Sequence, residues 1–171
     1  EPGVVTNEIN EAVKEYGHEE PDIPSNAALL RKQYLNDASM ILTSEAAVEE
    51  ASSPQVRAFA KRVIEERRKH RTLIESLAKQ RSLSLKAEIE KEPLDHAMDE
   101  ARAAMEKAIP LMHGPEIDRV YLAWLILEQD RIIAELTTLR PYLDKTFANF
   151  VTQTVPAHQA ARREAYKLLG A

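Results

Sequence analysis

Apolar residues recur with a helical period along most of the chain. Between Ala27 and Glu50 they follow one another at intervals of three, four or seven residues, the spacing of one face of an amphipathic helix. Similar stripes run from Pro54 to Gln80, from Pro115 to Leu139 and from Tyr142 to Leu169. The pattern therefore predicts four long helices, each with one face toward a shared core.

Short polar and proline-containing segments separate these helices. Ser53 can cap the second helix, with Pro54 as its first residue. Arg140 and Pro141 mark the break before the fourth helix, and Pro156 inside that helix should kink it. Two amphipathic helices joined by a tight turn are expected to be antiparallel neighbours.

The connection between the second and third long helices is much longer than the others. It spans residues 81–114 and contains one predicted short helix, Pro93 to Ala108. A connection of this length can cross a bundle from end to end. We therefore predict an all-α domain over residues 27–171, a ferritin-like antiparallel four-helix bundle with a long crossover that contains a short helix.

Residues 1–26 form a polar, acidic arm before this domain. Thr6 can cap a short helix that ends near Tyr16. The same composition also fits the alternative that residues 1–26 form a partly ordered tail. The predicted helix has an apolar face, which consists of Ile9, Val13 and Tyr16.

Composition narrows the class of protein. A length of 171 residues favours one domain, and a net charge of −5 speaks against a nucleic-acid partner. The absence of cysteine excludes disulfides, thiolate zinc sites and cysteine nucleophiles. The longest apolar run, Val120 to Leu127, is far short of the roughly 18–20 residues of a membrane span, and its all-round hydrophobicity predicts that the third long helix is the most buried.

Several carboxylates and imidazoles fall on or near the apolar stripes. On a helical wheel each long helix points at least one such side chain inward. Glu66 and Glu128 come out at one level of the bundle and His70 about one turn further along. Glu45 and His158 form a second level. The inward set consists of Glu45, Glu66, His70, Glu128 and His158.

Burying an unpaired charge costs several kcal/mol, so such side chains find partners, change protonation or bind a metal. Ferritin-like di-iron sites use a comparable supply of Glu and His, although the Glu66–His70 spacing lacks the usual Glu-x-x-His form. A metal site built on this set would suit iron, manganese or zinc. In the alternative interpretation the residues bond to one another or pair with Arg67 and Arg131.

Several segments resemble the bacterial domain of unknown function 4142 family. The resemblance covers residues 34–168 and is most specific in Ala-Ser-Ser-Pro-x-Val-x-x-Phe-Ala. Its residues are Tyr34-Leu35, Ala38, Glu45, the segment Ala51 to Ala60, Val63 to Glu66, Ile117 to Leu122 and Thr154 to Pro156.

The resemblance implies a ferritin-like fold and an exported protein of the cell envelope, but no established activity. In the family pattern a His commonly follows the acidic pair of the second helix, and another lies in the middle of the third. This chain has Arg67 and Gln129 at those positions. The resemblance alone therefore gives no metal site here.

Three functions remain open from the sequence. The first is a non-catalytic exported protein, periplasmic or associated with the outer membrane, with a binding or stress-adaptation role through an envelope partner or self-association. The start at Glu1 without Met fits a processed protein, and equally a trimmed chain. The second is a ferritin-like metal-binding protein, and the third binds a small molecule in the bundle core. We expect no enzyme activity and no obligatory cofactor.

Overall fold

The computed structural model describes residues 23–86 and 93–170, and within these ranges the chain is helical with no β-strand. The first predicted helix, in the N-terminal arm, lies outside the described residues. The elements are α2 (Asn26–Glu50), α3 (Pro54–Gln80), α4 (Pro93–Ala108), η1 (Ile109–Leu111), α5 (Pro115–Leu139), η2 (Arg140–Tyr142) and α6 (Lys145–Leu169).

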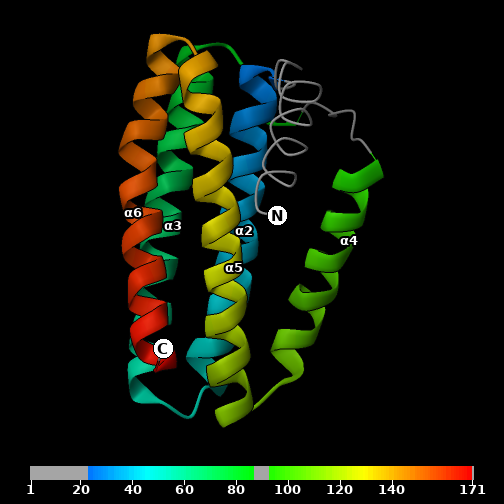
Figure 1. The fold of residues 1–171 in the computed structure, drawn as a ribbon, viewed down its shortest axis with the longest axis vertical. Helices are drawn as coiled ribbons and strands as arrows, with labels where there is room; N and C mark the ends of the chain where they lie inside the picture. Colours follow the sequence, from blue (N-terminus) through cyan, green and yellow to red (C-terminus); the bar gives the residue numbers. More distant parts are fainter. Residues whose placement is uncertain (1–22, 87–92, 171) are drawn as a thin grey trace, which may run out of the picture.

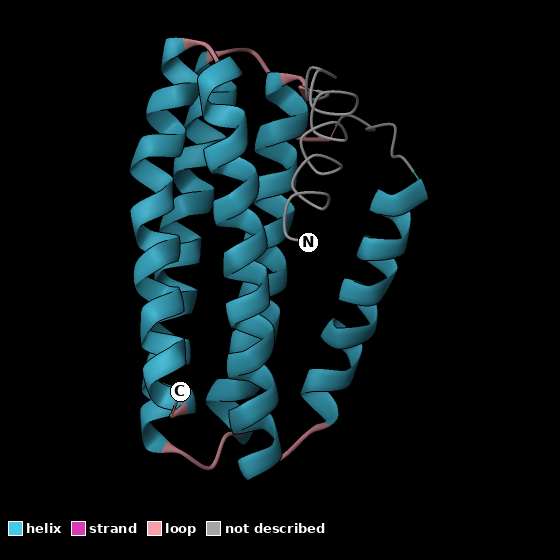
Figure 2. Cartoon of the chain, in the orientation of Figure 1, coloured by secondary structure: helices cyan, strands magenta, loops and turns pink. Residues whose placement is uncertain are grey.

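The four long helices stand side by side, and the shorter α4 lies outside them (Figure 1). Helix α2 packs along α3 and α5 packs along α6, while α2 also touches α5 and α3 touches α6. The loops that join them gather at the two ends of the bundle (Figure 2). The prediction of an all-helical bundle with a short helix in the crossover is therefore confirmed.

Most helices begin and end close to the residues predicted from the sequence, because capping residues and prolines act locally. The Ser53 hydroxyl accepts a hydrogen bond from the backbone of Val56, with Pro54 at the start of α3. The predicted start of the last helix at Tyr142 is wrong. The chain forms the 3₁₀ turn η2 there, and α6 begins only after the Asp144 carboxylate accepts from the backbone of Thr146 and Phe147.

The turn between α2 and α3 is tied to the start of α5. Asp118 accepts hydrogen bonds from the Ser53 backbone N–H, at 3.1 Å, and from the Ser52 hydroxyl. The backbone N–H of Gly114 donates to the carbonyl of Glu50 at 2.9 Å. The Ala-Ser-Ser-Pro segment therefore serves here as a structural junction between the two helix pairs.

Most of the core is apolar, with Phe59, Tyr121, Leu125 and Phe147 among its fully buried side chains. The buried Tyr121 hydroxyl pairs with that of Ser44 at 2.7 Å, which satisfies both groups. The prediction that the helix with the Val120–Leu127 run is the most buried is wrong, because Ala123 and Leu127 in this run are exposed, Leu127 to 68%. Among the described helices, none is both long and apolar enough to cross a membrane.

Candidate functional site

A polar cluster lies in the apolar core, near the midpoint of each long helix. We call it the central cluster. All of its side chains are buried, although four of its six members are charged or can become charged. It consists of Asp37 on α2, Arg67 and His70 on α3, Gln129 on α5, and Thr154 and His158 on α6.

Arg67 is the centre of this cluster. Its Nη1 atom lies 3.0 Å from Nε2 of His158 and 3.3 Å from Oδ1 of Asp37. The second carboxylate oxygen of Asp37 lies 2.6 Å from Nδ1 of His70. The buried Asp37 charge is thus shared between a guanidinium and an imidazole, as a carboxylate in a low-dielectric interior requires.

The remaining polar atoms of the two histidines form hydrogen bonds with the outer members of the central cluster. Nε2 of His70 lies 3.1 Å from the Thr154 hydroxyl. Nδ1 of His158 bonds to Oε1 of Gln129, whose amide nitrogen contacts the Met40 sulfur at 3.5 Å. Both ring nitrogens of each histidine therefore have a partner within the core.

These contacts fix the protonation of His158. A guanidinium can only donate, so Nε2 of His158 accepts from Arg67, and Nδ1 carries the proton that is donated to Gln129. Burial lowers the pKa of His158 well below its ordinary 6.5, and the charges of Arg67, His70 and Arg131 lower it further. The imidazole is therefore neutral at pH 7.

Two of the five residues predicted to face inward lie at the surface instead. The side chain of Glu45 is 48% exposed and pairs with Arg68 at 3.1 Å. That of Glu66 is 52% exposed and only reaches Arg67 Nη2 at 4.0 Å. The placement was wrong because the buried stripe of α3 is centred between Val63 and Arg67, about 80° around the helix from Glu66.

The other three predicted residues are more enclosed but do not form one site. The rings of His70 and His158 are 6.0 Å apart in the central cluster. Glu128 belongs to a different place and pairs with Arg131 at 2.8 Å and Arg102 at 3.4 Å. In the part of the chain that the structure describes, no three His, Cys, Asp or Glu side chains are grouped to hold a metal ion. A metal site at the five residues stays a prediction.

Two residues of the central cluster, Asp37 and Thr154, are not among the predicted site residues. Asp37 lies seven residues after Leu30 and therefore on the same, apolar face of the helix. This position could have identified it, had aspartates been placed on the helical wheel along with Glu and His. In the sequence, Gln129 stands out only as a departure from the family pattern, whereas Arg67 is also an expected pairing partner of the inward residues. The structure places both in contact with His158.

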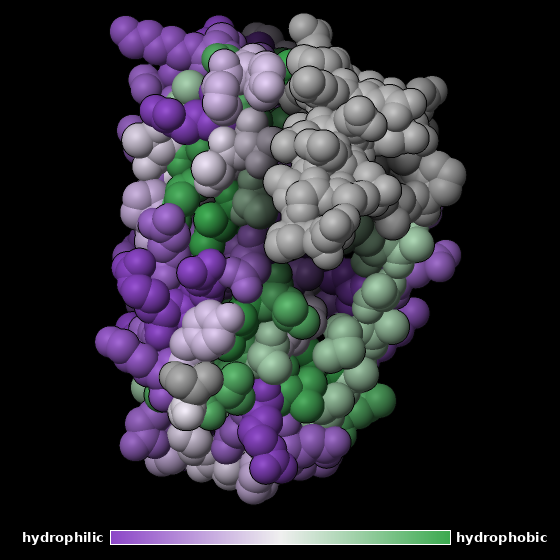
Figure 3. Space-filling model, viewed as in Figure 1, coloured by the Kyte–Doolittle hydropathy of each residue, from purple (hydrophilic) through white to green (hydrophobic). Residues whose placement is uncertain are grey.

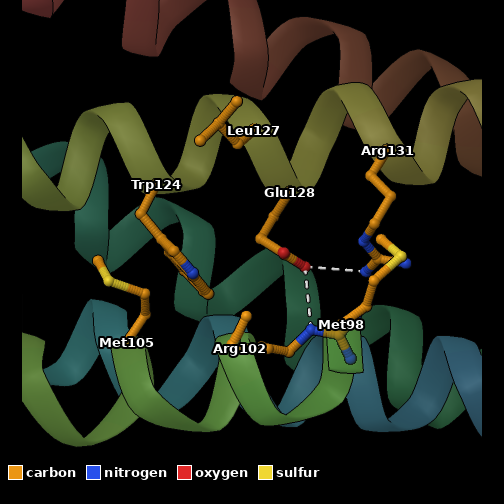
Figure 4. Close-up of a pocket in the computed structure, with 8 residues that line it drawn as sticks. Met98, Arg102, Met105, Trp124, Leu127, Glu128 and Arg131 are labelled. Carbon is orange, nitrogen blue, oxygen red and sulfur yellow. Dashed lines mark hydrogen bonds and ion pairs between the residues drawn. The ribbon is translucent and has the colours of Figure 1, made fainter. Parts of the chain in front are cut away.

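The second candidate site is a groove of about 360 Å³ between α4 and α5. We call it the α4–α5 groove; its apolar walls are Met98 and Met105 from α4 and Trp124 and Leu127 from α5 (Figure 4). Apolar side chains gather beside α4 in the lower half of the space-filling view (Figure 3). Such a concave apolar surface is the usual setting of a binding site.

Charged side chains complete the groove. Glu128 bridges Arg102 and Arg131 across it, as the dashed lines in Figure 4 show. Arg131 also donates to Oδ1 of Asn36 at 3.0 Å. The charged residues of its lining are two arginines, Arg102 and Arg131, and one carboxylate, Glu128. The groove lining therefore carries a net positive charge.

Described side chains connect α4 to both α2 and α5. Ser39 on α2 donates to Glu106, and Arg102 reaches Glu128 on α5. The chain of η1 then leads into the bundle through the buried Ile109. Helix α4 diverges from the long helices toward its N-terminal end (Figure 1), and the groove lies between α4 residues 98–105 and α5.

Comparisons with known proteins support a family but no activity. The description "Domain of unknown function (DUF4142)" belongs to the family profile that matches residues 10–168. A solved structure, described as the crystal structure of a DUF305 fragment from Deinococcus radiodurans, is similar at 14% identity and a TM-score of 0.74, covering 88% of this chain and 99% of the fragment. That similarity shows the fold alone. No curated protein matches the sequence. The profile covers most of the chain, which therefore belongs to the DUF4142 family.

Proposed function

We propose that the protein is a non-catalytic, exported component of the bacterial cell envelope that binds a partner through the α4–α5 groove. The observation that carries this proposal is the contrast between interior polar groups that bond to one another and an apolar groove that is open beside α4. An envelope location is what the family resemblance implies, and a role in stress adaptation is one setting for such binding.

The central cluster favours a structural role for the buried polar residues. General acid–base chemistry needs a group within reach of a substrate proton. Here both nitrogens of His70 and of His158 already have protein partners, and His158 is enclosed on all sides. We infer that the cluster fixes the register of the four helices, a known use of buried polar groups.

The chemistry of the groove defines the partner. Its walls of Met, Trp and Leu suit an apolar helix face, and thioether side chains adapt to varied partners. The two arginines of its lining, Arg102 and Arg131, outnumber the one carboxylate, Glu128, and favour acidic side chains next to that face. We therefore propose an acidic, amphipathic helical segment as the ligand.

The order in which the four long helices are connected is also part of this proposal. We propose a ferritin-like arrangement, in which the α2–α3 pair and the α5–α6 pair are joined by the crossover that contains α4. The contacts within and between the pairs and the position of α4 outside the long helices support it (Figure 1).

Site-specific photo-crosslinking in the native host tests the binding role. A photoreactive residue at Leu127 should give a discrete adduct with one envelope protein, and the adduct should disappear when Arg131→Glu is added. The same probe at Tyr166, which is exposed on α6, is the matched control. Identical adducts at both positions, or recovery of the protein only from the cytoplasmic fraction, would count against the proposal.

Metal binding is the second candidate, because Asp37 lies within hydrogen-bond distance of His70, and Arg67 contacts both Asp37 and His158. A groove of about 240 Å³ between α3 and α6 is lined by His70 and Thr154 and offers a path inward. Elemental analysis after incubation with Fe²⁺, Mn²⁺ or Zn²⁺ tests it. Near-stoichiometric metal that His70→Ala loses would favour this candidate, and no retained metal would exclude it.

A further inference from the structure

The first 22 residues carry more negative charge than the whole chain. They contain seven acidic residues and one lysine, whereas the net charge of the protein is −5. The remaining residues are therefore close to neutral. This acidic segment and the α4–α5 groove, whose lining has two arginines and one glutamate, are complementary in charge.

The same segment has the pattern of an amphipathic helix. Ile9, Val13 and Tyr16 recur at intervals of four and three residues, and Thr6 stands where a cap is expected. Acidic residues flank this apolar face at Glu8 and Glu15. The sequence thus contains the kind of ligand that the groove requires.

The segment is long enough to reach the groove. It joins the described chain at the half-exposed Ile23, just before α2. The groove lies at the level of Asn36, which bonds to Arg131, ten residues and about 15 Å along α2 from its start. Residues 17–22 can span up to about 20 Å when extended. A helix over residues 6–16 therefore fits beside α4 and α5.

We propose that residues 6–16 dock as a helix in the α4–α5 groove, with Ile9, Val13 and Tyr16 against its apolar walls and the flanking acids toward Arg102 and Arg131. This inference rests on the proposed binding role of the groove and names its resident occupant. The partner must displace the arm to bind, so the arm lowers the apparent affinity of the groove.

Trp124 is the only tryptophan of the chain and lines the groove, so its fluorescence reports on the groove directly. In the full-length protein, Val13→Asp should shift Trp124 emission to the red and increase its quenching by acrylamide. Asn7→Asp adds the same charge on the opposite face of the predicted helix and should change neither signal. Equal behaviour of the two variants would overturn the inference.

A second measurement does not disturb the apolar face. The chain has no cysteine, so Lys14→Cys on the outward face allows one nitroxide label. The label should broaden the amide signals of residues 98–105 and 124–131, and adding Leu127→Glu should abolish the broadening. Unbroadened signals in both segments would refute docking. If Leu127 cross-links to a partner but residues 6–16 do not dock, the proposed function holds and the inference fails. If residues 6–16 dock but no partner is cross-linked, the inference holds and the proposed function fails.

Discussion

Nη1 of Arg67 lies 3.0 Å from Nε2 of His158, and both side chains are almost wholly buried in the middle of the bundle. The contact joins α3 to α6, while Asp37 joins the same guanidinium to α2 and Gln129 joins the same imidazole to α5. One hydrogen-bonded path thus links all four long helices. Each residue on it depends on its neighbours, since an unpaired polar group at this depth is costly.

Arg67→Met should therefore destabilise the protein strongly. The substitution leaves the buried Asp37 carboxylate with His70 as its remaining hydrogen-bond partner, and breaking a buried pair costs about 3–5 kcal/mol. Arg68→Met is the matched control, because its exposed pair with Glu45 contributes less than about 1 kcal/mol. Urea unfolding measures both. Equal losses in the two variants would contradict the role given to Arg67.

The free energy of unfolding should fall as the pH is lowered below about 6.5. The pKa of His158 is well below 6.5 in the folded protein, so the unfolded chain binds a proton in this window that the folded chain does not. Stability is therefore fully present above pH 6.5 and is lost toward acid, by up to about 1.4 kcal/mol per pH unit for this one proton.

The variant His158→Gln should reduce this acid slope, because it removes the titrating group. His96→Gln, at an exposed position of α4, controls for the loss of a histidine as such. Urea unfolding between pH 7 and pH 5 gives the slopes. An unchanged slope in His158→Gln would show that other groups cause the acid sensitivity.

Asp118→Ala should loosen the junction between the helix pairs. The substitution removes the acceptor of the Ser53 N–H and of the Ser52 hydroxyl, a loss of about 1–2 kcal/mol. Asp130→Ala, on the same helix, removes only an exposed pair with Arg162 and should cost less than about 1 kcal/mol. Thermal unfolding of the two variants should rank them in this order, and the reverse order would argue against the junction.

Pro156→Ala should raise stability by about 1–3 kcal/mol, because it restores a donor for the Thr152 carbonyl inside a helix and removes a steric clash. Helix α6 continues through Pro156, as predicted, and the side chain is exposed, so no core packing is lost. The expected kink stays a prediction that the same variant tests. A destabilised variant would show that the bundle needs the bend.

The helices were predictable because apolar periodicity and capping residues act locally. Ser53 and Pro54 gave the start of α3, whereas Tyr142 misled because the chain forms a 3₁₀ turn before Asp144 caps α6. The site was less predictable, since it depends on where each stripe meets its neighbours. Glu66 is next to Arg67 in sequence, yet a rotation of about 100° separates an exposed side chain from a buried one.

The role of Asp37 could not be predicted from the sequence for the same reason. A lone acid on an apolar stripe gives no sign of its partner until Arg67 and His70 are placed beside it by the packing of α2 on α3. The groove depends on tertiary structure even more, because Leu127 belongs to an apolar run that periodicity alone would bury.

The protonation of His158 tests the closed interior most directly. Long-range ¹H–¹⁵N NMR of the imidazole at pH 7 should show a neutral ring with the proton on Nδ1 and a free electron pair on Nε2, as donation from Arg67 requires. A charged ring, a proton on Nε2, or signals that shift when Zn²⁺ is added would show that the interior is open to ligand chemistry and would contradict the account.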